Sequence, residues 1–283
     1  MNYRHAYHAG NFADVLKHLA LTLVIEHLKL KPAPFRIVDT HAGVGIYDLG
    51  SVEAEKTGEW RDGIGRVLDC SHIPVAVTDV IGPYLAAVRA LNRRGAVTRY
   101  PGSPELARRL MRDTDRLVAN ELHAADCASL RRAMAGDARV KVMELDAWVA
   151  IKSLLPPRER RGLVLIDPPF EETGELARML DGLPAATRRF ATGTFMLWYP
   201  IKDPRPVARF HARARQSGFA KLLVAEQTIR DARDATRLNG SGLLVVNPPF
   251  TLADRLATVL EWLTPLLAQD AGASWRVEAL ATC

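Results

Sequence analysis

The sequence predicts an α/β fold built on a doubly wound, mostly parallel sheet, and three observations lead to this expectation. Short apolar runs alternate with segments of helical periodicity from about residue 117 onward. A glycine-bearing turn, Thr40 to Gly45, follows the first apolar run, and acidic residues end three later runs. Ligands of such sheets bind at the carboxyl ends of the strands. The turn and the acidic residues are therefore expected at one ligand-binding edge.

The elements are expected in a regular order. A helix over about 12–30 begins at Asn11, which suits an N-cap, and a strand over 35–39 follows. Further strands are expected at 117–121, 140–144, 163–167, 194–198, 221–227 and 243–247. Helices are expected at 104–111, with Ser103 as cap, around 129–134, and at 147–155, 174–183 and 207–216. The segment 228–242 is predicted to be a mobile loop.

The interval between the glycine turn and the second strand of the sheet is longer than the fold requires. The acidic residue that contacts the ribose in a nucleotide-binding βαβ unit lies roughly 20 residues beyond the glycine turn. Here 78 positions separate Gly43 from Glu121. The sequence therefore predicts a small inserted helical subdomain over 51–98, and a discontinuous main domain formed by 1–50 and 99–283.

The composition predicts a soluble globular protein. With 283 residues, 48% of them apolar, the chain can bury a sizeable core. No apolar run reaches the roughly 18 residues of a membrane span, and the N-terminus lacks the apolar region of a secretory signal, so a cytoplasmic location is expected. Cys70, Cys127 and Cys283 are scattered without CxxC spacing, which argues against a disulfide framework and a cysteine-based zinc site.

The charge favours an acidic partner, and nucleic acid is the commonest one. The net charge is +6 and the pI is near 9.4. A solvated helix face would explain any single basic cluster. Together, the clusters favour a phosphate-binding surface made of Arg158, Arg160, Arg161, Arg188, Arg189, Lys202, Arg205, Arg209, Arg213 and Arg215.

Three features at the ends of successive strands predict a nucleotide-like cofactor. Asp39-x-x-x-Gly43-x-Gly45 has the form of a methyltransferase first motif, in which glycines let the backbone approach the ligand. Glu121 is placed to accept hydrogen bonds from ribose hydroxyls, and Asp146 to accept one from an adenine amine. Taken singly, a plain tight turn, a surface glutamate and a helix-capping aspartate would explain them.

The tetrapeptide Asp167-Pro168-Pro169-Phe170 predicts methylation of an exocyclic adenine amine. It follows the buried-strand run Leu163 to Ile166, so a carboxylate is delivered to the ligand edge. An adenine amine is a poor nucleophile. If Asp167 and the Pro168 carbonyl accept its two N–H bonds, the lone pair can point at the methyl group. Phe170 would stack on the base, and such a contact contributes roughly 1–3 kcal/mol. The alternative interpretation is an Asp-Pro turn that ends the strand and has no catalytic role.

Two other groups of residues invite different interpretations. Asn247-Pro248-Pro249-Phe250 is a second copy of the motif without its charge, and it is predicted to close the last strand and start a helix. His5, His8, His18 and His41 with Asp14 raise the alternative of a metal-dependent hydrolase. His41 lies in the glycine turn, and no second pair of acidic ligands has metal-like spacing, so no metal is expected.

Several strings together resemble the RlmJ family, bacterial methyltransferases that make N6-methyladenine in 23S ribosomal RNA. They extend over essentially the whole chain: Tyr3-Arg4-His5-x-x-His8-Ala9-Gly10-Asn11, Ala13-Asp14-Val15-x-Lys17-His18, Asp39-Thr40-His41-Ala42-Gly43, Tyr100-Pro101-Gly102-Ser103-Pro104, Asp167-Pro168-Pro169-Phe170 and Leu197-Trp198-Tyr199-Pro200. The resemblance implies a Rossmann-like class I S-adenosylmethionine-dependent methyltransferase sheet with a helical insertion, a monomer, no metal, and action on free rRNA.

The resemblance also implies roles for individual residues. Asp167 would be the catalytic proton acceptor, and Tyr3, with Arg4 and His5 beside it, would contact RNA. The cofactor would contact His18, His41, Ser103, Glu121, Asp146, Ala147 and Asp167, with Gly43 in the turn. Glycine is expected where Ala147 stands and tyrosine where Phe170 stands. A backbone contact to the cofactor remains possible with alanine at position 147. Stacking on the base remains possible with phenylalanine at position 170.

The predicted function is therefore methyl transfer from S-adenosylmethionine to N6 of one adenine in 23S rRNA. DNA adenine methylation is the nearest alternative, because the tetrapeptide serves both polymers and does not sense the 2′-hydroxyl. A catalytically silent RNA-binding module is a further alternative, distinguished by its lack of cofactor binding.

Overall fold

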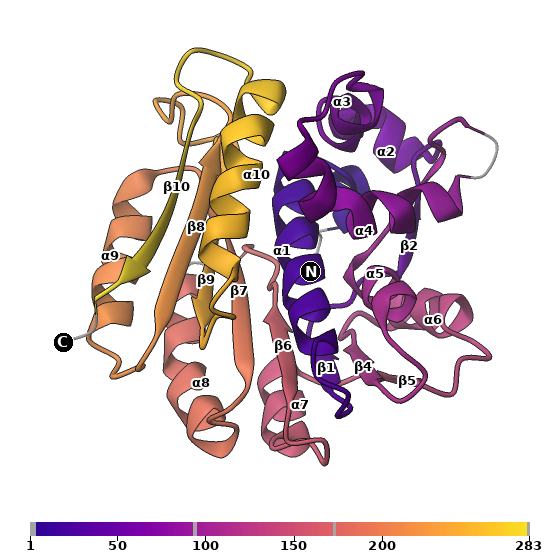
Figure 1. Cartoon of the computed structure of the whole chain (residues 1–283), viewed down its shortest axis with the longest axis vertical. Helices are drawn as coiled ribbons and strands as arrows, with labels where there is room; N and C mark the ends of the chain where they lie inside the picture. The colour runs from indigo at the N-terminus through magenta and orange to yellow at the C-terminus, as the bar shows by residue number, and fades with distance from the viewer. Residues whose placement is uncertain (1–3, 93–94, 172–173, 282–283) are drawn as a thin grey trace.

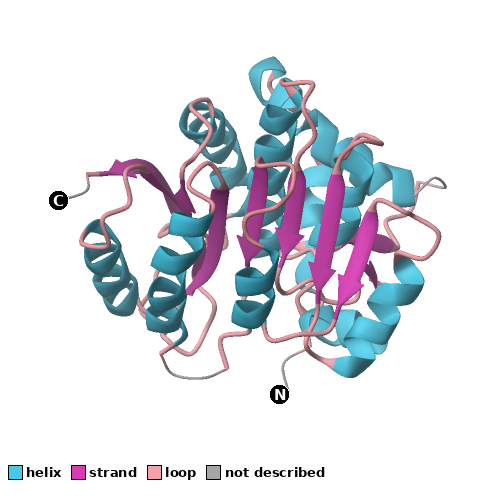
Figure 2. Cartoon of the chain, turned by 90° about the horizontal axis from the view of Figure 1, so that it is seen from below, coloured by secondary structure: helices cyan, strands magenta, loops and turns pink. Residues whose placement is uncertain are grey.

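The centre of the molecule is an eight-stranded sheet. The computed structural model describes residues 4–92, 95–171 and 174–281. The strand order is β10-β8-β9-β7-β6-β1-β4-β5, and helices cover both sides of the sheet (Figures 1 and 2). The strands are β1 (Arg36–Asp39), β4 (Arg116–Asn120), β5 (Val140–Met143), β6 (Gly162–Ile166), β7 (Thr194–Ile201), β8 (Leu222–Thr228), β9 (Gly240–Val246) and β10 (Ser274–Leu280).

The sheet is predominantly parallel, as the alternation of strands and helices predicts. β1 pairs in parallel with β4 and β6, β4 with β5, and β6 with β7. Only the C-terminal part reverses direction: β9 lies antiparallel between β7 and β8, and β10 pairs antiparallel with β8. The strand β10 was not predicted, so the strand that ends before Asn247 is not the last one.

Different helices cover the two faces of the sheet. Leu163 and Leu165 point to the face covered by α1 (Phe12–Lys29), α4 (Val75–Leu91), α5 (Ser103–Leu110), α6 (Ala124–Ala133) and α10 (Leu252–Leu267). Val164 and Ile166 point to the other face, covered by α7 (Ala147–Leu154), α8 (Glu175–Arg189) and α9 (Pro204–Arg215). This alternation is the two-residue period of a strand buried on both faces.

The first helix is enclosed by other helices. Every residue of α1 from Phe12 to Ile25 is buried, and the helix packs against α4, α5 and α10. The predicted cap is confirmed, because the Asn11 side chain accepts hydrogen bonds from the backbone N–H groups of Ala13 and Asp14. Enclosure explains why α1 is apolar around most of its circumference.

The segment predicted as an insertion is helical. It contains α2 (Val52–Thr57), a short 3₁₀ turn (Glu59–Arg61), α3 (Ile64–Asp69) and α4. A two-stranded antiparallel sheet, β2 (Ile46–Asp48) with β3 (Arg99–Pro101), joins its ends, pairing Asp48 with Arg99. Buried residues of α3 and α4 belong to the same apolar cluster as α1. The subdomain boundaries at 51 and 98 remain a prediction.

Several element boundaries differ from the prediction. Gly102 is the N-cap of α5 and Ser103 its first residue, so Ser103 is not the cap. β8 extends to Thr228 and β9 begins at Gly240, so only 229–239 connects them and the predicted loop over 228–242 was too long. The prediction that a helix begins after the 247–250 tetrapeptide is confirmed by α10, whose extent was not predicted.

Candidate active site

A cavity of about 310 Å³ lies at the carboxyl ends of β1, β4, β5 and β6, within the size range of small-molecule sites. Every residue predicted to bind the cofactor lines it: His18, His41, Gly43, Ser103, Glu121, Asp146, Ala147 and Asp167. Pro168 and His5 line it as well. Strand order accounts for this convergence, because four parallel neighbours end at one edge.

Glu121 is held in place by the backbone. Its carboxylate accepts the N–H of Gly43 at 2.9 Å through Oε2 and the N–H of His123 at 2.8 Å through Oε1. Burial raises the pKa of Glu121, and these two hydrogen bonds oppose the rise. The Gly43 turn requires glycine, since φ is +62° and an added Cβ would lie 2.2 Å from Tyr47 Oη.

Asp146 acts as a helix cap. Oδ1 accepts the N–H groups of Trp148 and Val149 at 3.0 and 3.1 Å, which fixes the start of α7. Oδ2 lies 3.4 Å from Nη2 of Arg178. Ala147 is the first residue of α7 and is buried at the cavity wall. The capping role and a cofactor contact are compatible, because Oδ2 is bonded only weakly.

Two histidines of the cavity are neutral. Burial lowers the pKa of His18 to about 3 and that of His41 to about 4. His18 Nδ1 lies 2.7 Å from Tyr100 Oη, and His41 Nδ1 lies 2.8 Å from Thr40 Oγ1. Neutral imidazoles keep one N–H donor and one acceptor each, so both residues are suited to hydrogen bonding rather than to charge pairing.

Asp39 is a fully buried carboxyl behind the cavity. Ser103 Oγ donates to its Oδ2 at 2.6 Å. Burial raises the pKa of Asp39 to about 7, although the Ser103 hydrogen bond works against that rise. The hydrogen bond to Asp39 therefore fixes the orientation of the Ser103 side chain at the cavity wall.

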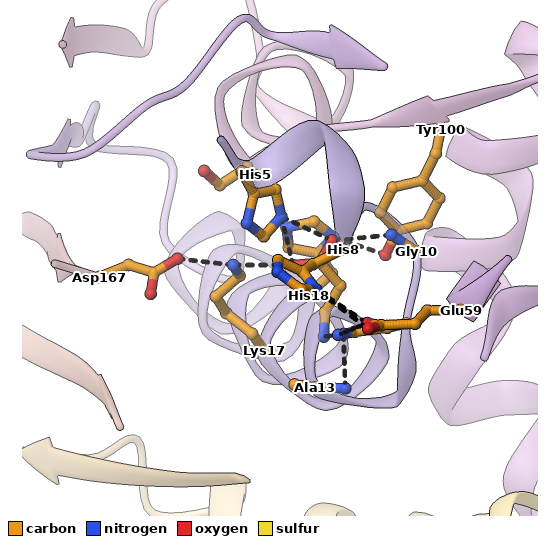
Figure 3. A network of polar contacts seen from close by, with 12 residues as sticks. His5, His8, Gly10, Ala13, Lys17, His18, Glu59, Tyr100 and Asp167 are labelled. Atoms are coloured by element: carbon orange, nitrogen blue, oxygen red, sulfur yellow. Dashed lines mark hydrogen bonds and ion pairs between the residues drawn. The ribbon is translucent and has the colours of Figure 1, made fainter. Parts of the chain in front are cut away.

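A buried ion triad connects the tetrapeptide to the first helix (Figure 3). Lys17 Nζ lies 2.6 Å from Asp167 Oδ2 and 2.8 Å from Asp14 Oδ1. Asp14 also accepts the Gly10 N–H at 2.9 Å and lies 2.9 Å from His5 Nε2. Burial lowers the pKa of Lys17, but the two carboxylates outweigh it and hold that pKa well above its usual range.

Sequence reasoning assigned no role to Lys17. It stands in the quoted N-terminal string, yet Asp167 is 150 positions away, so no local pattern links them. The sequence did contain a signal, because an aspartate and a lysine stand three residues apart in a helix whose residues are mostly apolar. Charges enclosed in that way need partners.

The predicted RNA-contacting residues lie at different distances from the cavity. His5 lines it and contacts Tyr47 edge-on, with ring centroids 5.2 Å apart. Arg4 is exposed and lies 3.9 Å from Glu53 of α2. Tyr3 falls outside the described residues.

Phe170 is not among the residues that line the cavity and packs against an aromatic neighbour. Its ring meets Trp198 edge-on, with centroids 5.6 Å apart, and it lines a separate groove toward α8 and α9. Lys17 Nζ lies 5.9 Å from the centroid of the Trp198 ring. Trp198 Nε1 is buried and has no hydrogen-bond partner among the described residues. This aromatic pair therefore borders both the ion triad and the groove.

Asn247 lies at the opposite edge of the sheet. β9 runs antiparallel to β7, so its end lies beside Thr194, where β7 begins. The Asn247 side chain donates to the carbonyls of Ala191 and Gly193 at 3.0 and 2.9 Å. Its backbone has φ of 53°, which asparagine tolerates better than most residues. The second tetrapeptide is a structural turn, as predicted.

The N-terminal histidines have separate carboxylate partners. His5 bonds to Asp14, and His8 Nδ1 lies 3.0 Å from Glu59. Within residues 4–92, 95–171 and 174–281, no three His, Cys, Asp or Glu side chains are grouped so as to hold a metal ion. In the same ranges, no helix has the length and apolarity needed to cross a membrane.

Comparison with known proteins identifies the family. A family model described as ribosomal RNA large subunit methyltransferase D, RlmJ, matches residues 32–280. The chain belongs to the RlmJ family. Proteins named ribosomal RNA large subunit methyltransferase J, from Haemophilus influenzae and Escherichia coli, are each 40% identical to it over 98% of the chain and 98% and 99% of their own lengths.

A solved structure agrees with this assignment. The crystal structure of protein LPL1258 from Legionella pneumophila is 32% identical in sequence and superposes with a TM-score of 0.88, covering 96% of this chain and 98% of its own. The predicted family is confirmed, and so is the predicted fold class, a Rossmann-like class I methyltransferase sheet.

The residues at the sheet edge of this RlmJ-family chain suit S-adenosylmethionine. The Glu121 carboxylate, anchored by two backbone N–H groups, faces the cavity at the end of β4, where ribose hydroxyls need an acceptor. The Gly43 turn lies close to Tyr47, whose hydroxyl a Cβ would meet, and its N–H holds Glu121. Neutral imidazoles from His18 and His41 add hydrogen-bonding groups. The cavity thus has the acceptors and donors that a nucleoside with an amino-acid tail requires.

Proposed function

We propose that this chain transfers a methyl group from S-adenosylmethionine to N6 of a single adenine in 23S rRNA, acting on free RNA during ribosome biogenesis. One observation carries the proposal. The carboxylate of Asp167, at the end of buried strand β6, lines the same cavity as all the residues predicted for the cofactor. Membership of the RlmJ family supports the RNA substrate.

Asp167 is oriented for a hydrogen bond to the adenine amine. Lys17 holds Oδ2, and no described residue hydrogen-bonds to Oδ1, which leaves Oδ1 to accept one N6–H. The Pro168 carbonyl accepts the second N6–H. With both hydrogens held, the nitrogen lone pair points at the electrophilic methyl group that S-adenosylmethionine supplies when bound. The proton released from N6 passes to Asp167 Oδ1.

Lys17 has a positioning role in this scheme. Its ammonium, only 5% exposed, bridges Asp14 and Asp167 and so fixes the side-chain rotamer of the catalytic carboxylate. A rigid carboxylate favours the near-attack geometry on which methyl transfer depends. Asp14 in turn holds the ammonium and the His5 ring, so the start of α1 is tied to the reacting edge.

The remaining assignments rest on the family resemblance, and residues lining the cavity support those proposed for the cofactor. Glu121 binds the ribose hydroxyls, Asp146 with Ala147 binds the adenine of the cofactor, and His18, His41 and Ser103 bind its other polar groups. Phe170, with Trp198, contacts the target base, and Tyr3, Arg4 and His5 contact RNA beside it. The protein works as a monomer in the cytoplasm, without a metal.

The test compares the two tetrapeptides in the same assay. N6-methyladenine is mapped by mass spectrometry in total rRNA from cells with and without the protein, and methyl transfer to transcript RNA and to duplex DNA is measured in vitro. Asp167→Ala should abolish transfer, while the matched variant Asn247→Ala should retain it. Full transfer by Asp167→Ala would refute the mechanism. Methylation of DNA with no mark in rRNA would favour the DNA alternative instead.

A further inference from the structure

A groove outside the cofactor cavity runs between α8 and α9 and begins at the tetrapeptide. Its apolar wall contains Phe170, Leu176, Leu180, Pro200, Val207 and Phe210. Phe170 directly follows the two prolines that line the cavity, so the groove continues outward from the place where the target adenine is expected. In Figure 1, α8 and α9 lie together at one end of the sheet.

Two cations of the groove have no carboxylate partner. Lys202 and Arg209 line it and are exposed, and neither forms an ion pair with any described residue. By contrast, Arg213 pairs with Asp181. The carboxylates of the lining are also occupied, because Asp203 pairs with Arg205 at 2.8 Å, and Glu175 lies 3.9 Å from Arg178. Among the described residues that line the groove, the uncompensated charge is therefore positive.

The position of these cations distinguishes them from the other basic clusters. Lys202 follows the end of β7, at the same sheet edge as Asp167, and α9 carries Arg209 from there. Arg158 precedes β6, and Arg188 precedes β7, so both lie at the opposite edge. The basic clusters therefore do not form one surface as predicted, and of these clusters only the Lys202 to Arg215 segment adjoins the candidate site.

We propose that this groove binds the nucleotide next to the target adenine in a single-stranded RNA segment, with its phosphate on Lys202 and Arg209. The inference rests on the proposed function. A base must leave its stack to reach Asp167, and the neighbouring nucleotide then has to follow a path along the surface. An apolar wall suits a base or ribose, and two free cations suit a phosphate.

The test uses variants that remove equal charge at opposite edges of the sheet. Lys202→Ala/Arg209→Ala should raise KM for transcript RNA about tenfold and leave kcat and the dissociation constant for S-adenosylmethionine unchanged. The slope of log KM against log salt should fall by about 0.7, the contribution of one phosphate neutralised on a single strand. Arg158→Ala/Arg188→Ala, the matched control, should change neither quantity.

The outcomes separate the two proposals. If the wild-type protein methylates RNA and the groove variant has unchanged KM and salt slope, the groove proposal is overturned. An equal effect in the control variant would also overturn it, because the loss would then reflect net charge alone. If the wild-type protein methylates no RNA, the proposed function is refuted, and the groove proposal is refuted with it.

A separate observation concerns two buried phenols beside the cofactor cavity. Tyr84 of α4 and Tyr100 of β3 are both fully buried, and their hydroxyl oxygens are 3.0 Å apart. Tyr100 Oη lies 2.7 Å from His18 Nδ1. The three groups form a hydrogen-bonded chain from the helical segment to a residue of the cavity wall, with Tyr100 beside His18 in Figure 3.

Only one direction of this chain satisfies every donor. If Tyr84 donates to Tyr100 and Tyr100 donates to His18 Nδ1, each hydroxyl hydrogen has an acceptor. If the order is reversed, the Tyr84 hydroxyl needs another acceptor, and no described residue offers one. Leaving a buried hydroxyl hydrogen without an acceptor is unfavourable, so the first direction is preferred.

We infer that Tyr84, through Tyr100, fixes His18 in the tautomer with its proton on Nε2. His18 then presents a donor to the cavity, which suits a carboxylate oxygen of an amino-acid tail. The helical segment thereby contributes to cofactor binding without contacting the cofactor. Tyr84 and Tyr100 are positioning residues in this scheme.

Nitrogen-15 NMR of histidine-labelled, ligand-free enzyme tests the inference directly. Wild-type His18 should show the pattern of a neutral ring protonated at Nε2, and Tyr84→Phe and Tyr100→Phe should weaken that preference. Calorimetry should show about fivefold weaker S-adenosylmethionine binding for Tyr100→Phe, the loss expected for one hydrogen bond. Tyr199→Phe, a buried phenol in another network, is the control. A wild-type proton on Nδ1 would overturn the inference.

Discussion

Replacing Lys17 by methionine should destabilise the protein by about 3–5 kcal/mol, because a buried carboxylate loses its cation. The side chains of Lys17, Asp14 and Asp167 are 5%, 1% and 15% exposed, so solvent screens the triad little. Methionine has a similar length and leaves no large cavity. The cost therefore reports the uncompensated charge of Asp14 rather than lost packing.

The double variant Asp14→Asn/Lys17→Met provides the internal control. With both charges of the inner pair removed, at least 2 kcal/mol of the loss should return, as expected for coupled partners in one ion network. Recovery should be incomplete, because Asp167 still lacks the ammonium, and the His5 ring and the Gly10 N–H then meet a neutral amide at position 14.

The effect of Lys17→Met should depend on pH. Burial raises the pKa of Asp14, but His5 and Lys17 outweigh it and hold this pKa well below its usual range. A carboxyl with a depressed folded pKa stabilises the protein above its unfolded pKa of about 3.9 and loses that contribution as pH falls through the folded pKa. The difference between wild type and variant should therefore be largest above pH 4 and should shrink in acid.

Urea unfolding followed by circular dichroism at pH 7 and pH 3.5 measures these quantities. The m-value should stay constant, so that the midpoint alone reports the change in stability. A loss below about 1 kcal/mol at pH 7, or a double variant no more stable than Lys17→Met, would refute the description of the triad as a desolvated ion network.

Three further predictions concern single residues. Glu121→Gln should weaken S-adenosylmethionine binding about tenfold in calorimetry, since charged hydrogen bonds contribute about 1.5–3 kcal/mol; unchanged affinity would contradict the ribose assignment. Because the pKa of Asp39 is raised to about 7 in the folded state, its stabilising contribution is complete below about pH 3.9 and lost as pH rises to 7. Asp39→Asn should flatten the dependence of unfolding free energy on pH over that interval, and an unchanged slope would mean that another group titrates. Asn247→Ala should lower stability by about 1–2 kcal/mol through two lost hydrogen bonds, without changing methyl transfer per folded molecule.

Residues at the ends of strands were predictable because local pattern and topology act together there. Glu121 and Asp167 each follow a short apolar run, and parallel strands bring such ends to one edge. The apolar periodicity of α10, with Leu252, Leu256 and Leu263 on one face, was also present in the sequence but was not used.

The alternation of polar and apolar residues in β10, from Ser274 to Ala279, was likewise present in the sequence but was not used, although most of this strand is exposed. Other features have no local signal. β9 runs antiparallel to β7 and β8, so its carboxyl end lies at the sheet edge opposite the cavity, and Asn247 lies there with it. The sequence does not reveal this strand direction. The bond from Lys17 to Asp167 joins segments 150 positions apart, which no periodicity reveals.

The position of α10 has a consequence for how the enzyme matures during translation. This helix packs against α1, which carries Lys17, but it is synthesised more than two hundred residues later. Until it emerges from the ribosome, the apolar side of α1 lacks one of its covering helices. A nascent chain that stops before residue 252 should therefore hold the whole tetrapeptide and cofactor edge, yet remain inactive and prone to aggregate.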